Sequence, residues 1–345
     1  MIMSLRTKIA GLLLVMATPL YSGACLARDC VGPACDTLGL AFLYSYFVDT
    51  FVAVGQNGAV RTSYDGRTWT TRNLAVQLQA ASHGNGLLYA SGLTDTAYVS
   101  ANGQSWTQLA SLNTGTSDTY FSIASLNGIL VAGGSAGSGQ VRRSSDGGQS
   151  WTNLTNSPAS SEVGDLEVGD GVLRGVTGGG HFLQFNSDAS SYSFLTPTGA
   201  TALTALAYES GVWVVCGPGG YVARTADDGA TWSNQILNAT HALEGVAYGN
   251  GRFVVAGHDG TNTQVWTSTD GGFTFAQSSP PFGRTRGIAY GGGVFVIAGN
   301  GGLLAYSATP EVSGSWVDVS TGSDHSFDIV AALQSELQGI VRTAP

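Results

Sequence analysis

The sequence has few charged residues and a single lysine, Lys8. Charged residues make up 11% of the 345 positions and are scattered without blocks of one sign, against about a quarter in an average chain. The formal net charge is −9, and such a surface repels phosphate backbones and anionic lipid headgroups. We therefore expect neither nucleic acid nor a membrane surface as a partner.

Long apolar runs and metal-binding motifs are also absent. The longest apolar stretch, 9–20, is too short to cross a bilayer, so we expect no transmembrane segment. No Cys-x-x-Cys pair or His/Cys cluster with zinc spacing occurs. The 50 glycines follow no three-residue period, which excludes collagen. We predict no metal and no cofactor.

Residues 1–27 have the pattern of a secretory signal peptide. Arg6 and Lys8 precede the apolar stretch, and small residues follow at 22–24 and at Ala27. Cleavage after Ala24 and cleavage after Ala27 both fit this pattern, and a lipid anchor on Cys25 is the less favoured alternative. The pattern predicts a secreted or periplasmic protein.

The cysteines fit an oxidising compartment. Cys30 and Cys35 lie in the segment 28–39 and flank a turn-like stretch, so we predict a disulfide that closes a small loop; two free thiols are the alternative. Cys216 ends an apolar run, which indicates a buried small hydrophobic residue.

What the chain has in abundance is glycine, serine, threonine and apolar residues, the last at 43%. This composition predicts an all-β fold of short strands and tight turns. One motif recurs, Ser/Thr-x-Asp followed by Gly, Thr/Ser and Trp/Phe. Its acidic position is held by Asp65, Asn102, Asp146, Asp227 and Asp270. With two weaker copies, the terminal aromatics stand at 69, 106, 151, 194, 232, 275 and 316, which are 37 to 45 residues apart.

A second element in each period is a hairpin signal. In the sixth period Gly249-Asn250-Gly251 separates two apolar runs, and such turns need positive φ. The period therefore holds four strands, A at about 243–248, B at 252–257, C at 264–268 and D at 274–278, with the acidic motif between C and D. Four-stranded antiparallel units repeated about every 42 residues are typical of propeller blades.

We accordingly predict a seven-bladed β-propeller over residues 40–322. Residues 323–345 form a closing segment, in which 327–333 resembles another A strand. Whether this strand closes the ring or covers an edge is left open by the sequence.

The acidic motif resembles the Asp box of the sialidase-type (BNR) repeats, and the resemblance covers nearly all of residues 40–320. In such a turn the carboxylate accepts hydrogen bonds from the amides of its own loop, the glycine supplies positive φ, and the aromatic packs between blades. Because the motif recurs in blade after blade, we interpret these acidic residues as turn-formers and not as catalysts.

A single ring behind a secretion signal resembles the photosystem II assembly/stability factor family. The matching features are the strands around Ala247-Tyr248-Gly249-Asn250-Gly251 and the turn 144–151. The resemblance implies a non-enzymatic scaffold that binds a partner protein. This chain lacks that family's arginine-rich patch, so only the architecture and a generic binding role carry over.

Candidate ligand contacts come from the B–C and D–A loops, which share the face opposite the acidic turns. The polar residues expected there as binding residues are His181, His241, His258, Asp259, Arg284 and Arg286. The alternative function is a carbohydrate-active enzyme, a polysaccharide lyase or glycoside hydrolase. In that case His241 or His258 is the base and Arg284 or Arg286 holds a carboxylate. The simpler interpretation is that all six are ordinary polar loop residues.

Overall fold

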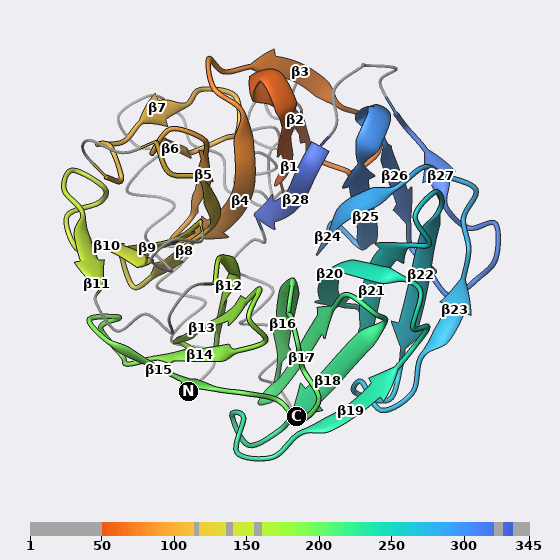
Figure 1. The fold of residues 1–345 in the computed structure, drawn as a ribbon. Helices are drawn as coiled ribbons and strands as arrows, with labels where there is room; N and C mark the ends of the chain where they lie inside the picture. Colours follow the sequence, from red (N-terminus) through yellow and green to blue (C-terminus); the bar gives the residue numbers. More distant parts are fainter. Residues whose placement is uncertain (1–49, 114–116, 136–140, 155–160, 321–326, 334–345) are drawn as a thin grey trace, which may run out of the picture. The chain divides into compact units, whose positions relative to one another are not determined.

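The computed structural model describes residues 50–113, 117–135, 141–154, 161–320 and 327–333, all within one compact unit, Val48–Pro345. These residues form seven four-stranded antiparallel sheets around a common axis, as Figure 1 shows. The predicted seven-bladed all-β propeller is therefore confirmed. The predicted leader and the Cys30–Cys35 disulfide lie outside the described residues.

Each blade runs from an inner strand A to an outer strand D. The first blade holds β28 (Phe327–Leu333), β1 (Thr50–Gly55), β2 (Ala59–Ser63) and β3 (Thr70–Asn73). The second holds β4 (Leu78–Gly84), β5 (Leu87–Gly92), β6 (Ala97–Ser100) and β7 (Thr107–Gln108). The third holds β8 (Tyr120–Leu126), β9 (Ile129–Gly134), β10 (Val141–Ser144) and β11 (Thr152–Leu154). The fourth holds β12 (Val163–Gly169), β13 (Val172–Thr177), β14 (Phe182–Phe185) and β15 (Tyr192–Leu195).

The remaining blades repeat this order. The fifth holds β16 (Ala205–Glu209), β17 (Val212–Gly217), β18 (Tyr221–Thr225) and β19 (Ser233–Ile236). The sixth holds β20 (Ala242–Gly249), β21 (Arg252–His258), β22 (Thr263–Ser268) and β23 (Ala276–Ser278). The seventh holds β24 (Thr285–Gly291), β25 (Val294–Gly299), β26 (Leu304–Ser307) and β27 (Val317–Asp318). Single 3-10 turns, η1 (Gln56–Gly58) and η2 (Asn300–Gly302), join strands B and C of the first and seventh blades.

The carboxyl-terminal strand β28 closes the ring. It pairs antiparallel with β1 and supplies the innermost strand of the first blade. Phe327 is fully buried and packs with Ala289, Val296 and Ala298 of the seventh blade. Of the two roles left open by the sequence, the structure shows ring closure.

The A–B hairpins have the geometry that their dipeptides predict. Asn250 and Gly251 have φ of 45° and 77°, and the same pair of left-handed residues occurs at the A–B turns of blades two to seven. Two successive positive φ values match the right-handed twist of the paired strands. Ser210 occupies the first position in the fifth blade with φ 46°, so the turn tolerates a residue other than Asn, Asp or Gly.

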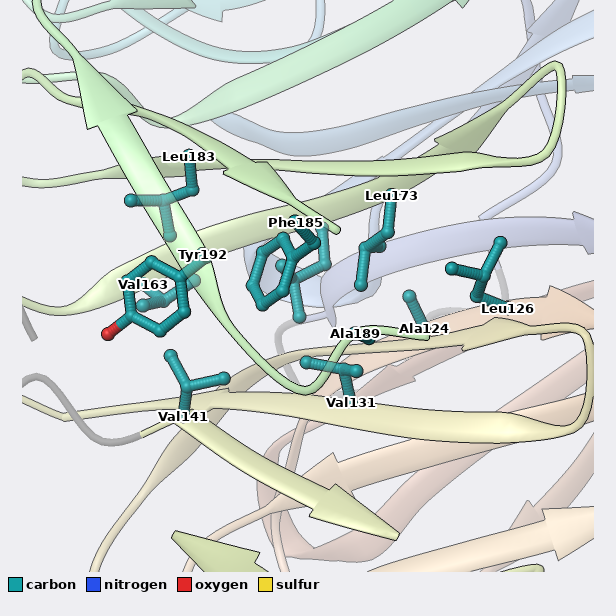
Figure 2. Packing of buried hydrophobic residues seen from close by; sticks show 11 residues of the cluster. Ala124, Leu126, Val131, Val141, Val163, Leu173, Leu183, Phe185, Ala189 and Tyr192 are labelled. Carbon is teal, nitrogen blue, oxygen red and sulfur yellow. The ribbon is translucent and has the colours of Figure 1, made fainter. Parts of the chain in front are cut away.

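The hydrophobic core is divided into seven clusters, each shared by two adjacent blades. Figure 2 shows the cluster between blades three and four, where Val131 and Val141 face Leu173, Phe185 and Tyr192. A blade therefore buries its two faces only when both neighbours are present. Cys216 is fully buried in one of these clusters, as predicted, and burial raises the pKa of its thiol to about 12.

The acidic turns between strands C and D are held by their own backbone amides. The N–H groups of Arg67 and Thr68 each donate to Asp65 Oδ1 at 2.8 Å, and the Thr68 hydroxyl donates to Oδ2 at 2.8 Å. Asp146, Asp227 and Asp270 accept equivalent bonds. Partial burial by itself raises the pKa of Asp65, but these bonds to the ionised form together outweigh it and lower the pKa to about 2.

A glycine in each acidic turn packs on the preceding blade. Gly272 has φ 88°, and a Cβ placed there would lie 2.9 Å from Val214 Cγ2 of the fifth blade. Gly66, Gly103, Gly148 and Gly229 have the same combination of positive φ and close contact. The turn therefore needs glycine for two separate reasons, its own dihedral angles and its fit against the neighbouring blade.

Candidate binding cavity at the ring axis

A cavity of about 250 Å³ lies at the axis, where the A strands of blades two to seven begin. This end carries the D–A and B–C loops, the face on which the sequence places candidate ligand contacts. Its lining comes from six blades: Gln79, Phe121, Glu162, Gly164, Asp165, Leu203, Thr204, Ala205, Glu244, Gly245, Val246, Arg286, Gly287 and Ile288.

β-bulges place one extra residue of each strand at this cavity. The register of strand A shifts by one residue in β4, β8, β12, β20 and β24. The residues inserted by these shifts are Gln79, Phe121, Gly164, Glu244 and Arg286, and all five line the cavity. A bulge re-aims a side chain that a regular strand would send to one sheet face. The ring therefore builds the cavity with the same irregularity repeated in successive blades.

The carboxylate of Glu244, in the cavity wall, is held by side chains from its own blade and from the next. His258 Nε2 lies 2.9 Å from Glu244 Oε1, and Arg286 Nη1 lies 3.7 Å from the same oxygen. Arg284 Nη2 is 3.2 Å from His258 Nε2. The structure thus brings together three of the predicted residues, His258, Arg284 and Arg286, around a carboxylate.

Both ring nitrogens of His258 are engaged. The Gly260 N–H donates to Nδ1 at 3.0 Å, and Nε2 lies 2.9 Å from Glu244 Oε1 and 3.2 Å from Arg284 Nη2. His258 is also buried, with 3% of its surface exposed. Its Nδ1 faces its own loop and not the cavity. This geometry fits a role for His258 in orienting Glu244 and does not fit a role as a general base.

Asp165 and Glu167 stand in β12 where the other inner strands have small residues. Ala205, Gly245 and Gly287 take the Asp165 position in later blades. Asp165 accepts hydrogen bonds from the Leu206 and Leu166 N–H groups at 3.1 and 2.8 Å. Burial nevertheless raises the pKa of Asp165 to about 6, and burial together with the Asp165 charge raises the pKa of Glu167 to about 8.

Of the six predicted residues only Arg286 lines the cavity, and His181, His241 and Asp259 lie at the same end of the ring. His241 is buried with its ring 5.5 Å from Trp266, and His181 donates to or accepts from Thr196 Oγ1 at 3.0 Å. Asp259 accepts the N–H groups of its own loop. The burial of both histidines differs from the expectation of polar loop residues. The His241 ring lies against Trp266 of the sixth blade, and His258 is the last residue of β21.

Sequence reasoning did not assign Glu244 or Asp165 to the site. In the sequence, Glu244 looks like an ordinary strand residue. It stands out only when the repeats are aligned on the first buried residue of strand A, which is Leu243 in this blade. The alignment then places Gln79, Phe121, Thr204, Glu244 and Arg286 at one position, polar or large in most blades. Asp165 shows up in the same alignment as an acid among small residues.

The described residues contain no group of three His, Cys, Asp or Glu side chains arranged to hold a metal ion. They also contain no helix of the length and hydropathy needed to cross a membrane.

The fold defines the chain as a seven-bladed β-propeller, and comparison with solved structures agrees. YCF48 bound to a D1 peptide is similar with a TM-score of 0.54 and 19% identity, covering 71% of this chain and 84% of that one. YCF48 from Cyanidioschyzon merolae gives 0.54 and 15%, covering 71% and 87%. The WD40 repeats of RRP9 give 0.54 and 11%, covering 73% and 87%. No protein-family model and no curated protein matches the chain. At these identities the likeness shows the fold alone.

Proposed function

We propose that this chain is a binding propeller that holds a peptide segment of a partner protein in the cavity at the ring axis. The observation that carries the proposal is the set of bulges that turns one residue of each of five inner strands into the same cavity. Bulges are features that position side chains near sites. A similar propeller, YCF48, is bound to a D1 peptide, which supports a peptide as the ligand class.

The size of the cavity favours a peptide side chain over a polymeric glycan. Sites for drug-sized ligands enclose about 300–1,000 Å³, and this cavity encloses about 250 Å³. The alternative enzyme function needs a base that faces its substrate, whereas the lone pair of His258 Nδ1 accepts a hydrogen bond from Gly260. None of the tyrosines in the described part of the chain lines the cavity.

Secretion and the Asp-box relationship belong to the same proposal. The leader pattern of residues 1–27 supports export, and the amide-bonded carboxylates of the acidic turns support kinship with Asp-box repeats. Intact-mass measurement of the exported protein tests the first point, since cleavage predicts a chain that begins at Cys25 or Arg28. A mature protein that begins at Met1 contradicts it.

Peptide binding is tested by selection from a random dodecapeptide display library on the full chain. Selected peptides are then titrated against two variants that add the same bulk on opposite faces. Gln79→Trp fills the cavity, whereas Gln104→Trp changes an exposed acidic turn. We expect Gln79→Trp to abolish binding and Gln104→Trp to leave it unchanged. Failure to select any peptide, or equal affinity for both variants, contradicts the proposal.

A further inference from the structure

The cavity wall combines apolar and acidic surface. Leu203, Val246, Ile288 and Phe121 supply apolar lining, and the polar lining includes the carboxylates of Glu162, Asp165 and Glu244 against one guanidinium, Arg286. A side chain that fits such a wall has an apolar stem and a positive end. Lysine and arginine are the two residues that combine an apolar stem with a positively charged end.

The carboxylate of Glu244 is oriented in advance. Its Oε1 faces the buried His258 and, at 3.7 Å, Arg286. Its other oxygen, Oε2, has no partner among the residues that the structure describes. A carboxylate fixed from behind loses little side-chain entropy when a ligand binds its free oxygen.

Arg286 does not neutralise the cavity. Its Nε donates to Asn300 Oδ1 at 3.2 Å and its Nη1 lies near Glu244, so the guanidinium is already engaged on two sides. Glu162 is exposed and has no side-chain partner among the described residues. Three carboxylates against one guanidinium leave the lining with a net negative charge, in a chain of formal net charge −9.

From this complementarity we infer that the partner peptide inserts a lysine or arginine side chain into the cavity, with its cation at Glu244 and Glu162 and its stem against Val246 and Ile288. The inference rests on the proposed function and adds the chemistry of the partner. The occupant is one basic side chain of a peptide, not a free metal ion, because the described residues hold no three His, Cys, Asp or Glu side chains arranged around one ion.

The test uses the most enriched dodecapeptide from the selection and a copy in which each lysine or arginine is replaced by norleucine. Both are titrated by calorimetry against the full chain and its Glu162→Gln, Glu244→Gln double variant. Glu209→Gln, at the opposite end of an inner strand, is the matched control. We expect about a tenfold loss from either the norleucine peptide or the double variant, which corresponds to about 1.4 kcal/mol, and less than a twofold loss from Glu209→Gln.

The outcomes separate the two proposals. If peptides are selected and lost with Gln79→Trp but bind without a basic residue, the cavity binds peptides and the inference of a basic side chain is wrong. If no peptide is selected, both are wrong. If Ca²⁺ at about 1 mM binds the wild type but not the double variant, while the basic and norleucine peptides bind the wild type equally, the carboxylates form a metal site and the inference is overturned. Basic peptides whose affinity falls both with norleucine and in the double variant support it.

Discussion

Arg174 and Asp228 join two neighbouring blades through a bidentate ion pair. Arg174 Nε and Nη2 donate to Asp228 Oδ1 and Oδ2 at 2.8 and 2.6 Å, from strand β13 of the fourth blade to the acidic turn of the fifth. Arg174 is 6% exposed. Two adjacent carboxylates therefore hold this turn. Asp227 bonds to groups within the turn, and Asp228 bonds to the neighbouring blade.

We predict that Asp228→Asn lowers the free energy of unfolding by about 1–3 kcal/mol, because a buried guanidinium loses its charged acceptor. Asparagine tolerates the positive φ of 55° at this position. The control is Asp188→Asn in the preceding blade, where the carboxylate bonds mainly to Ser190. Urea unfolding monitored by tryptophan fluorescence measures both. Equal effects of the two changes would contradict an interblade role for Asp228.

The two glycines of the sixth acidic turn separate dihedral strain from packing. Gly271 and Gly272 both have positive φ, 76° and 88°, but an added Cβ would meet the preceding blade only at Gly272. We predict a loss of about 1–2 kcal/mol for Gly271→Ala, from the left-handed backbone alone. Gly272→Ala should lose roughly another 1–3 kcal/mol, because its Cβ would overlap Val214. Similar unfolding free energies for the two variants would show that the turn does not depend on the interblade fit.

Because β28 closes the ring, we expect the stability of the fold to depend strongly on Phe327, although it lies near the end of the chain. We predict that Phe327→Ala lowers the free energy of unfolding by about 3–5 kcal/mol, the usual cost of removing a buried phenyl ring. Phe194→Ala, at a ring that is 45% exposed, serves as the control and should change stability by less than about 1 kcal/mol. The measurement is denaturant unfolding of the full chain. A Phe327 variant as stable as the control would mean that β28 does not close the ring.

Glu167 makes the stability of the fold depend on pH. Burial, and after it the charge of Asp165, raises its pKa in the folded state to about 8 from the usual 4.5. A group of this kind stabilises the fold below its unfolded pKa, and the contribution is lost as pH rises through the folded value. We therefore predict that Glu167→Gln has the melting temperature of the wild type near pH 4 and exceeds it by several degrees above pH 8. Calorimetric scans across this range test the prediction, with Glu209→Gln as the control, and parallel curves for Glu167→Gln and the wild type would refute it.

The sequence carries the information for the blades more fully than for the cavity. The hairpin pairs such as Asn250-Gly251 and the acidic turns are local signals, because their dihedral angles and amide bonds involve residues a few positions apart. The site is not local. Glu244 meets His258 across a strand pair and meets Arg286 across a blade boundary, so no spacing in the chain marks them as partners.

Ring closure shows the same limit. The segment 327–333 has the apolar pattern of an inner strand, but its partner β1 (Thr50–Gly55) lies near the other end of the propeller sequence. Only the completed circle brings the two strands together. The bulges can be predicted in part. Aligning the repeats shows that Gln79, Phe121, Glu244 and Arg286 share one position, but the register shift itself depends on pairing with strand B.

Crosslinking shows where on the ring a partner peptide binds. A selected dodecapeptide with a diazirine side chain is bound to the full chain and irradiated, and the crosslinked residues are mapped by mass spectrometry. We predict crosslinks to the cavity segments around Phe121, Thr204, Glu244 and Arg286. Crosslinks confined to the opposite face, in the acidic turns around Tyr64, Gln104 and Phe273, would contradict it.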